Sequence, residues 1–188
     1  MGASRGCALS AVLPADAGVK VSVAELDAMP ELQAASLLAE CCGSSRWVSW
    51  MLARRPFGSR AAVFSAADEI WRSLDANDWR EAFSHHPRIG ERHNAVPQSE
   101  RGGAWAAGEQ SAVGRADDET RAALAAANGD YERRFGYIYI VCATGKSAGE
   151  MLALARERLR NDPEAELRIA AEEQGKITRL RLEKLLGS

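Results

Sequence analysis

Two adjacent histidines precede a proline in the stretch EAFSHHPRIGE, and the chain has only three histidines in all. Because the residue before a proline disfavours helical backbone, we expect His86 to close a short helix. The C-terminal end of a helix favours a cation, so we expect the pKa of this imidazole to be raised. A histidine near neutrality can accept and donate a proton, which makes His86 a candidate general acid–base. The alternative is a surface or helix-capping histidine. His85 points to a different side and is interpreted as incidental.

An arginine interrupts the apolar face of the last predicted helix. At 100° per residue, one stripe of this helix consists of Leu167, Ala170, Gln174, Ile177 and Leu185. Arg181 falls on the same stripe, and a guanidinium that faces a core cannot lose its charge. It therefore needs an anion, either a ligand or a carboxylate of the protein in a buried ion pair. A side chain that reaches the surface is a further alternative.

A carboxylate and an amide stand side by side in WAAGEQSAV, residues 105–113. Glu109 and Gln110 together offer acceptors and donors to a ligand with N–H and C=O groups, such as an amide or a urea. The pair alone indicates little, since Glu-Gln pairs are common on solvated helices.

Four residues that could bind a metal lie close together in sequence: His85, His86, Glu91 and His93. None of their pairs has the i, i+4 spacing of a helical H-E-x-x-H site, and Pro87 and Gly90 interrupt the segment. We therefore predict no metal site.

Helices are expected to position these residues. Capping boxes at Ser22 and Ser147 predict two helix starts, and the Asp162-Pro163 step predicts the start of the last helix. Apolar periodicity predicts a helix over residues 60–75. Asn77 is expected to cap the short helix through WREAFS. The interpretation is a single all-α domain, a bundle of about eight to nine helices.

Two stretches depart from the helical pattern. Residues 87–104 contain two prolines and several glycines without apolar periodicity, which predicts a loop of the length that tends to be functional. YIYIVCA is the one β-like run. It has no obvious partner strand, so it is either extended or a buried helical turn.

Composition limits the classes of function. The chain has 188 residues, a net charge of −2 and a pI near 6.0, so no strong positive field exists to bind nucleic acid or an acidic membrane. No apolar run approaches the ~18–20 residues of a membrane span. Four cysteines form no C-x-x-C pair, which indicates a reduced, cytoplasmic protein. Residues 1–20 are interpreted as a flexible lead with too short an apolar run for export, followed by one domain over 21–188.

Taken together, these segments resemble the family of 2-oxo-4-hydroxy-4-carboxy-5-ureidoimidazoline (OHCU) decarboxylases of uric acid degradation. The resemblance runs in order over roughly residues 24–186. It rests on HPRIGE at 86–91, WAAGEQSAV at 105–113, YERRFGYIYIVCATGKS at 131–147, RERLRN at 156–161 and KITRLRLEKLL at 176–186. The combination in this order is specific, whereas any one stretch alone would be weak.

The resemblance implies an all-helical carboxy-lyase, usually a homodimer, that converts OHCU to (S)-allantoin and CO₂ without a metal or organic cofactor. Three catalytic positions of the family fall on His86, Glu109 and Arg181. The resemblance implies that the residues lining the substrate pocket are Pro87, Ala106, Gln110, Tyr139, Ile140, Val141, Cys142 and Ala143, the last five through main-chain groups.

Two positions depart from the family pattern. Ala106 stands where the family often has serine, so one hydroxyl contact to the substrate is missing unless water or Ser111 replaces it. His85 stands where a small residue is common. The first departure leaves room for a related cofactor-free hydrolase or lyase of a ureide or hydantoin. A non-catalytic ligand-binding helical module is the second alternative, and the joint presence of the four site side chains argues against it.

The implied chemistry needs little from the protein. Decarboxylation leaves an electron pair, and the chain has no evident Schiff-base lysine or cofactor motif to accept it. The ring of the substrate must accept the pair itself. We hypothesise that Arg181 binds an anionic or carbonyl oxygen, that Glu109 and Gln110 bind the hydroxyl and ureido groups, and that His86 delivers a proton to one face.

Overall fold

A computed structural model describes residues 20–89, 100–109, 111–114 and 116–187. These residues form helices joined by irregular segments and contain no strand, which confirms the prediction of an all-α protein. The expected flexible lead falls almost wholly on residues 1–19, outside the described residues, so its separation from the domain stays a prediction. None of the described helices is long and apolar enough to cross a membrane.

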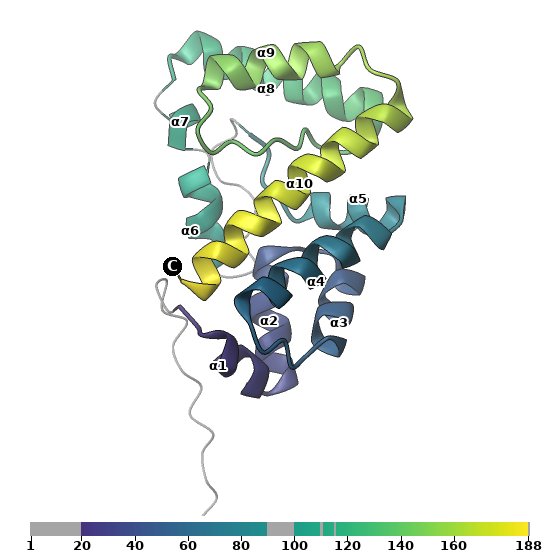
Figure 1. The fold of residues 1–188 in the computed structure, drawn as a ribbon. Coiled ribbons are helices and arrows are strands. Elements are labelled where there is room, and N and C mark those ends of the chain that lie inside the picture. The colour runs from purple at the N-terminus through teal and green to yellow at the C-terminus, as the bar shows by residue number, and fades with distance from the viewer. Residues whose placement is uncertain (1–19, 90–99, 110, 115, 188) are drawn as a thin grey trace, which may run out of the picture.

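The first five helices pack together at one end of the molecule (Figure 1). They are α1 (Val23–Ala28), α2 (Glu31–Cys41), α3 (Ser45–Ala53), α4 (Arg60–Ser73) and α5 (Ala76–Ser84). The predicted capping box of α1 is present, with Ser22 and Glu25 bonded to each other's backbone N–H groups. Asn77 does not cap α5, because the carboxylate of Asp75 accepts from two backbone N–H groups in the first turn and caps the helix one position before its start.

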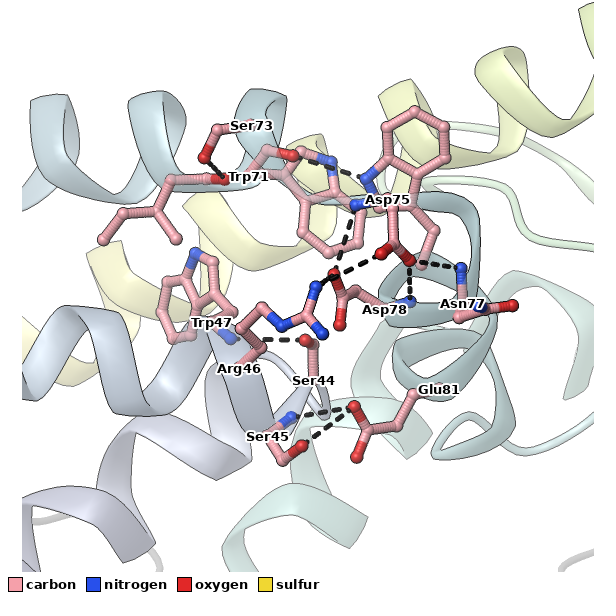
Figure 2. Close-up of polar contacts among 12 residues, drawn as sticks. Ser44, Ser45, Arg46, Trp47, Trp71, Ser73, Asp75, Asn77, Asp78 and Glu81 are labelled. Carbon is pink, nitrogen blue, oxygen red and sulfur yellow. Dashed lines mark hydrogen bonds and ion pairs between the residues drawn. The ribbon is translucent and has the colours of Figure 1, made fainter.

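Polar contacts fix α5 against α3 (Figure 2). Arg46 Nη1 lies 3.2 Å from Asp75 Oδ2 and 2.8 Å from Asp78 Oδ2, so one guanidinium on α3 contacts the cap and the first turn of α5. Further along α5, Glu81 Oε2 accepts from the backbone N–H and hydroxyl of Ser45 at 3.0 and 3.1 Å. These contacts set the direction of α5 and therefore the place where the two histidines leave it.

At the other end of the molecule, α8 (Asp118–Phe135) pairs with α9 (Ala148–Arg158). Gly136, at φ +78°, ends α8 in left-handed backbone, where glycine is favoured. The β-like run YIYIVCA follows this turn as an irregular segment without a strand partner, as one of the two interpretations expected. The predicted capping box of Ser147 with Glu150 begins α9.

The last helix, α10 (Pro163–Leu186), crosses the molecule diagonally and joins its two ends (Figure 1). It begins at the predicted Asp162-Pro163 step and packs on α2, α4 and α5. Trp71 Nε1 of α4 donates to the carbonyl of Ala171 at 2.9 Å, and Gly175 leaves room for the same indole ring. Because α10 packs on three other helices, its side chains are well placed to assemble a site.

Two short helices lie along one side of the molecule: α6 (Glu100–Glu109), which packs on α2, and α7 (Ser111–Gly114). The loop predicted over residues 87–104 is therefore too long, because α6 already begins at Glu100 despite the glycines in its first turn. Residues 90–99 lie outside the described part of the chain.

Candidate active site

The two histidines lie at the end of α5. The helix ends at Ser84 and His85 is its C-cap, so the expectation that His86 closes the helix was wrong by one residue. The backbone N–H of His86 still donates to the carbonyl of Phe83 at 3.1 Å. His85 is exposed and packs on Gly43 so closely that a Cβ at position 43 would lie 2.6 Å from the Cβ of His85. This contact fixes the backbone next to His86, which gives His85 a packing role that we did not expect.

A pocket opens beside His86, with about 420 Å³ of empty volume, part of it open to solvent. It lies between the end of α5, the segment before α9, the end of α6 and the middle of α10. Its lining residues are His86, Pro87, Ile89, Glu109, Tyr139, Ile140, Val141, Cys142, Ala143, Thr144, Ile177 and Leu180.

Most of the predicted site residues therefore meet around one pocket. His86, Pro87, Glu109 and residues 139–143 line it directly. Gln110 and the side chain of Ala106 lie outside the described residues. The roles of all these residues in catalysis stay predictions.

Arg181 is buried, and its partner is Glu109. Its Nη2 and Nε lie 2.9 and 3.2 Å from the two carboxylate oxygens of Glu109, a bidentate ion pair. A third donor, Nη1, contacts the backbone oxygen of Glu40 at 3.3 Å. Glu109 lines the pocket, whereas Arg181 is not among the described lining residues. Arg181 therefore forms an ion pair with a carboxylate of the protein, which was one of the alternatives for this residue. It acts on the pocket by holding the carboxylate of Glu109, which lines it.

The pKa of His86 is lowered from 6.5 to about 3, contrary to our expectation of a raised pKa. Burial of the imidazole is the largest cause, and the neighbouring Arg181 cation and His85 add to it, while Gln174 partly opposes it. A helix end favours a cation by only ~0.3–1 kcal/mol at exposed sites, whereas burial can shift a pKa by several units. His86 is therefore neutral at physiological pH.

The segment that precedes α9 is held by its main chain. Cys142 N donates to Glu173 Oε2 at 2.8 Å, and the carbonyl of Cys142 accepts from Lys146 Nζ at 2.7 Å. The carbonyl of Ile140 accepts from Arg158 Nη1 at 2.9 Å. These three groups are occupied by the protein. Among the described residues no hydrogen bond to the main chain of Val141 occurs, so its peptide groups are the better candidates for ligand contact.

The sequence did not indicate four of the lining residues: Ile89, Thr144, Ile177 and Leu180. Ile177 was placed on the apolar stripe of the last helix, but the apolar spacing of a helix is the same whether that face lines a pocket or packs in the core. Gln174 was missed as well. It is fully buried on α10 and interacts with His86. The signal that could have found it is the one that found Arg181, a polar residue on an apolar stripe.

A family profile and known proteins match this chain. The profile of the OHCU decarboxylase family matches residues 27–183. The chain is 38% identical over 145 residues to the uric acid degradation bifunctional protein TTL of Arabidopsis thaliana, covering 77% of this chain but only 45% of that protein. It is 30% identical over 137 residues to the 2-oxo-4-hydroxy-4-carboxy-5-ureidoimidazoline decarboxylase of Amia calva, covering 70% of this chain and 75% of that protein.

Solved structures share the fold. A crystal structure of an OHCU decarboxylase in the presence of (S)-allantoin superposes with a TM-score of 0.70 at 35% identity, covering 81% of this chain and 99% of that one. A crystal structure of an (S)-allantoin synthase has a TM-score of 0.66 at 18% identity and supports the fold alone, covering 89% of this chain and 54% of that one.

Proposed function

The chain belongs to the OHCU decarboxylase family, and on this premise we propose that it converts OHCU to (S)-allantoin with loss of CO₂. The observation that carries the proposal is the pocket in which His86, Glu109 and residues 139–143 meet. These segments are far apart in sequence, and no requirement of core packing would bring a histidine and a carboxylate to one cavity. The chain spans about 45% of the length of the Arabidopsis relative, so the activity of that longer protein is a proposal for this chain.

The substrate supplies its own electron sink. Its name places a hydroxyl and a carboxylate on C4 and a ureido group on C5 of an imidazoline, which has one carbon–nitrogen double bond in the ring. When the bond between C4 and the carboxylate breaks, CO₂ leaves and the electron pair forms C4=C5, while the π electrons move to the ring nitrogen, which takes a proton. Loss of the C4 hydroxyl proton and addition of a proton to C5 then give the C4=O and C5–H bonds of allantoin.

The protein must place groups around these two carbons. We assign the proton transfers to His86, which is neutral and lines the pocket. Glu109 is the member of the ion pair that faces the ligand, and its carboxylate can accept hydrogen bonds from the ureido N–H groups or the hydroxyl. Arg181 holds this carboxylate from behind at 2.9 Å. Positioning of this kind can lower a barrier by up to ~7–11 kcal/mol, and acid–base help adds ~10²–10⁴-fold.

A coupled assay tests the proposal. OHCU is generated fresh from urate with urate oxidase and hydroxyisourate hydrolase, the protein is added, and allantoin is followed by circular dichroism. We expect rapid formation of one enantiomer, and a fall in kcat of about 10²–10⁴-fold for His86→Asn. A wild-type rate equal to the slow racemic background would refute the activity and direct a screen of related ureides. A His86→Asn variant with wild-type kcat would refute the role of His86.

We further propose that the enzyme acts as a cytoplasmic homodimer. The resemblance to the family implies the dimer. The compartment is inferred from the described cysteines, Cys41, Cys42 and Cys142, which are buried free thiols. Light scattering coupled to gel filtration would give the mass in solution, and a mass near 20.3 kDa would contradict the dimer.

A further inference from the structure

A buried amide lies behind the imidazole of His86. Gln174, on α10, is fully buried, and its Nε2 donates to the hydroxyl oxygen of Thr178 at 3.2 Å. Its Oε1 is buried too and has no hydrogen-bond donor in standard geometry among the described residues. A buried carbonyl oxygen without a donor is unfavourable, so this atom needs an N–H or O–H group nearby.

The neighbouring donor is His86. The side chain of Gln174 interacts with the imidazole and favours its protonated form, which raises the pKa of His86 against the stronger opposing effects. An amide favours a protonated ring when its oxygen, not its nitrogen, faces a ring N–H. This sign points to Oε1 as the atom nearer His86, and Oε1 is the buried atom of Gln174 that has no other donor among the described residues.

The amide nitrogen of Gln174 is already engaged on the side away from His86. Thr178 accepts from Gln174 Nε2 at 3.2 Å, and the hydroxyl of Thr178 and the backbone of Ser44 both act to lower the pKa of the nearby Cys42 thiol. Burial dominates there and raises the pKa of Cys42 to about 12, so the thiol stays neutral. Gln174, Thr178 and Cys42 are all buried.

We propose that Gln174 is a positioning residue that fixes the tautomer of His86: Gln174 Oε1 accepts the proton-bearing ring nitrogen, and the bare ring nitrogen faces the substrate pocket. The inference rests on the proposed decarboxylation for its catalytic meaning, and it assigns the direction of proton transfer. With a lone pair facing the pocket, His86 first accepts a proton and does not begin as an acid.

The charges around His86 decide what happens next. Arg181 on α10 and His85 on the adjacent backbone both oppose a cation at His86, and the carboxylate of Glu109 is engaged by Arg181. A proton taken from the C4 hydroxyl is therefore held weakly and is passed on readily. In the balanced sequence, the O–H bond breaks as the ring nitrogen gains the proton, C4=O forms from the C4=C5 enol, and the same nitrogen delivers the proton to C5. One nitrogen on one face gives one enantiomer.

The test combines tautomer and kinetics. With only three histidines in the chain, ¹⁵N-labelled imidazoles can be assigned by comparison with His86→Asn, and long-range ¹H–¹⁵N correlation spectra report which ring nitrogen carries the proton. We expect one tautomer for His86 in the wild type and a mixed or reversed tautomer in Gln174→Met, which keeps the volume but removes the acceptor. We expect kcat to fall at least about tenfold with little change in KM.

A conservative variant separates positioning from folding. Gln174→Glu keeps an acceptor at the same reach, so we expect it to keep the wild-type tautomer and to raise the apparent pKa of His86 in the NMR titration. If Gln174→Met retains both tautomer and kcat, the inference is wrong. If Gln174→Met unfolds, a changed tautomer in the folded Gln174→Glu variant would overturn it instead. The spectra do not require turnover, so they test Gln174 even if the wild-type enzyme proves inactive on OHCU.

Discussion

Two arginine–glutamate pairs lie largely inside the described part of this molecule, and they differ in what surrounds them. Arg158 pairs with Glu166 at 2.6 Å between the end of α9 and the start of α10, eight positions apart in sequence. The hydroxyl of Tyr131 and the amide of Asn161 also donate to Glu166, and Arg158 lies over the ring of Tyr139. Protein groups therefore satisfy every side of this pair.

The second pair, Arg181 with Glu109, joins helices that are 72 positions apart. The Glu109 side chain retains 11% of its exposure and lines the pocket, whereas Glu166 has none. The same type of ion pair thus has two different roles in this protein. An ion pair enclosed by protein hydrogen bonds fixes a helix junction, and an ion pair with one open side presents a carboxylate to a ligand.

The largest effect is expected for Glu166→Gln. The substitution leaves the Arg158 cation buried without its counter-charge, which costs about 3–5 kcal/mol in the free energy of unfolding. Urea denaturation measures this loss. The kcat of the folded fraction should stay near wild type, because Arg158 still contacts the carbonyl of Ile140. Loss of kcat with unchanged stability would show that the enclosed pair is not structural.

For Glu109→Gln we expect the opposite balance, a large loss of activity and a smaller loss of stability. The variant lacks the charged acceptor that faces the substrate, so kcat/KM should fall about a hundredfold, or about 2.7 kcal/mol in transition-state free energy. Stability should fall less than in Glu166→Gln, because water in the pocket can solvate the released donors of Arg181. The coupled assay and urea denaturation measure the two quantities. Equal destabilisation by both variants would remove the distinction between the pairs.

The open pair also affects a titration. Burial and Arg181 depress the pKa of His86 to about 3 in the folded state, against 6.5 in the unfolded state. Between these values the unfolded chain binds the proton and the folded chain does not. The contribution of His86 to the free energy of unfolding therefore rises from pH 3 to pH 6.5 and is constant above that. His86→Asn should therefore flatten the stability curve below pH 6.5 in urea titrations at several pH values. A curve parallel to wild type would contradict the depressed pKa.

The smallest effect is expected for Lys184→Met. Lys184 Nζ lies 3.4 Å from Glu109 Oε1, but its side chain is 40% exposed, and such pairs contribute at most about 1 kcal/mol. We expect a modest rise in KM for the anionic substrate, which disappears at high salt because the charge is screened. Measurement of KM at two ionic strengths checks this, with Lys184→Arg as the charge-matched control. A rise that persists at high salt would assign Lys184 a direct contact.

Helix starts were predictable because capping is local. Ser22, Ser147 and Asp162 each meet their partners within three residues. Asn77 was misassigned because an equally good cap, Asp75, stands two positions earlier, and local rules do not decide between them.

The site was predictable only in part. Arg181 was found because it violates an apolar stripe, but its partner Glu109 comes from a distant helix that no spacing rule connects. Another buried arginine, Arg158, was not found, because in RERLRN its charged neighbours hide which one turns inward. The pKa of His86 was predicted with the wrong sign for a similar reason. The helix end is visible in sequence, whereas burial and the Arg181 cation are produced by folding.

The long last helix carries members of both ion pairs, with Gln174 between them, on one continuous backbone. Glu166 and Arg181 are fifteen positions apart, about 22 Å along the axis at 1.5 Å per residue. One inserted or deleted residue between them would turn everything beyond it by about 100°. The enclosed pair would keep its place while Gln174 or Arg181 turned away from the pocket. Side chains along this helix can therefore be exchanged, but its length between Glu166 and Arg181 is fixed by the two ion pairs.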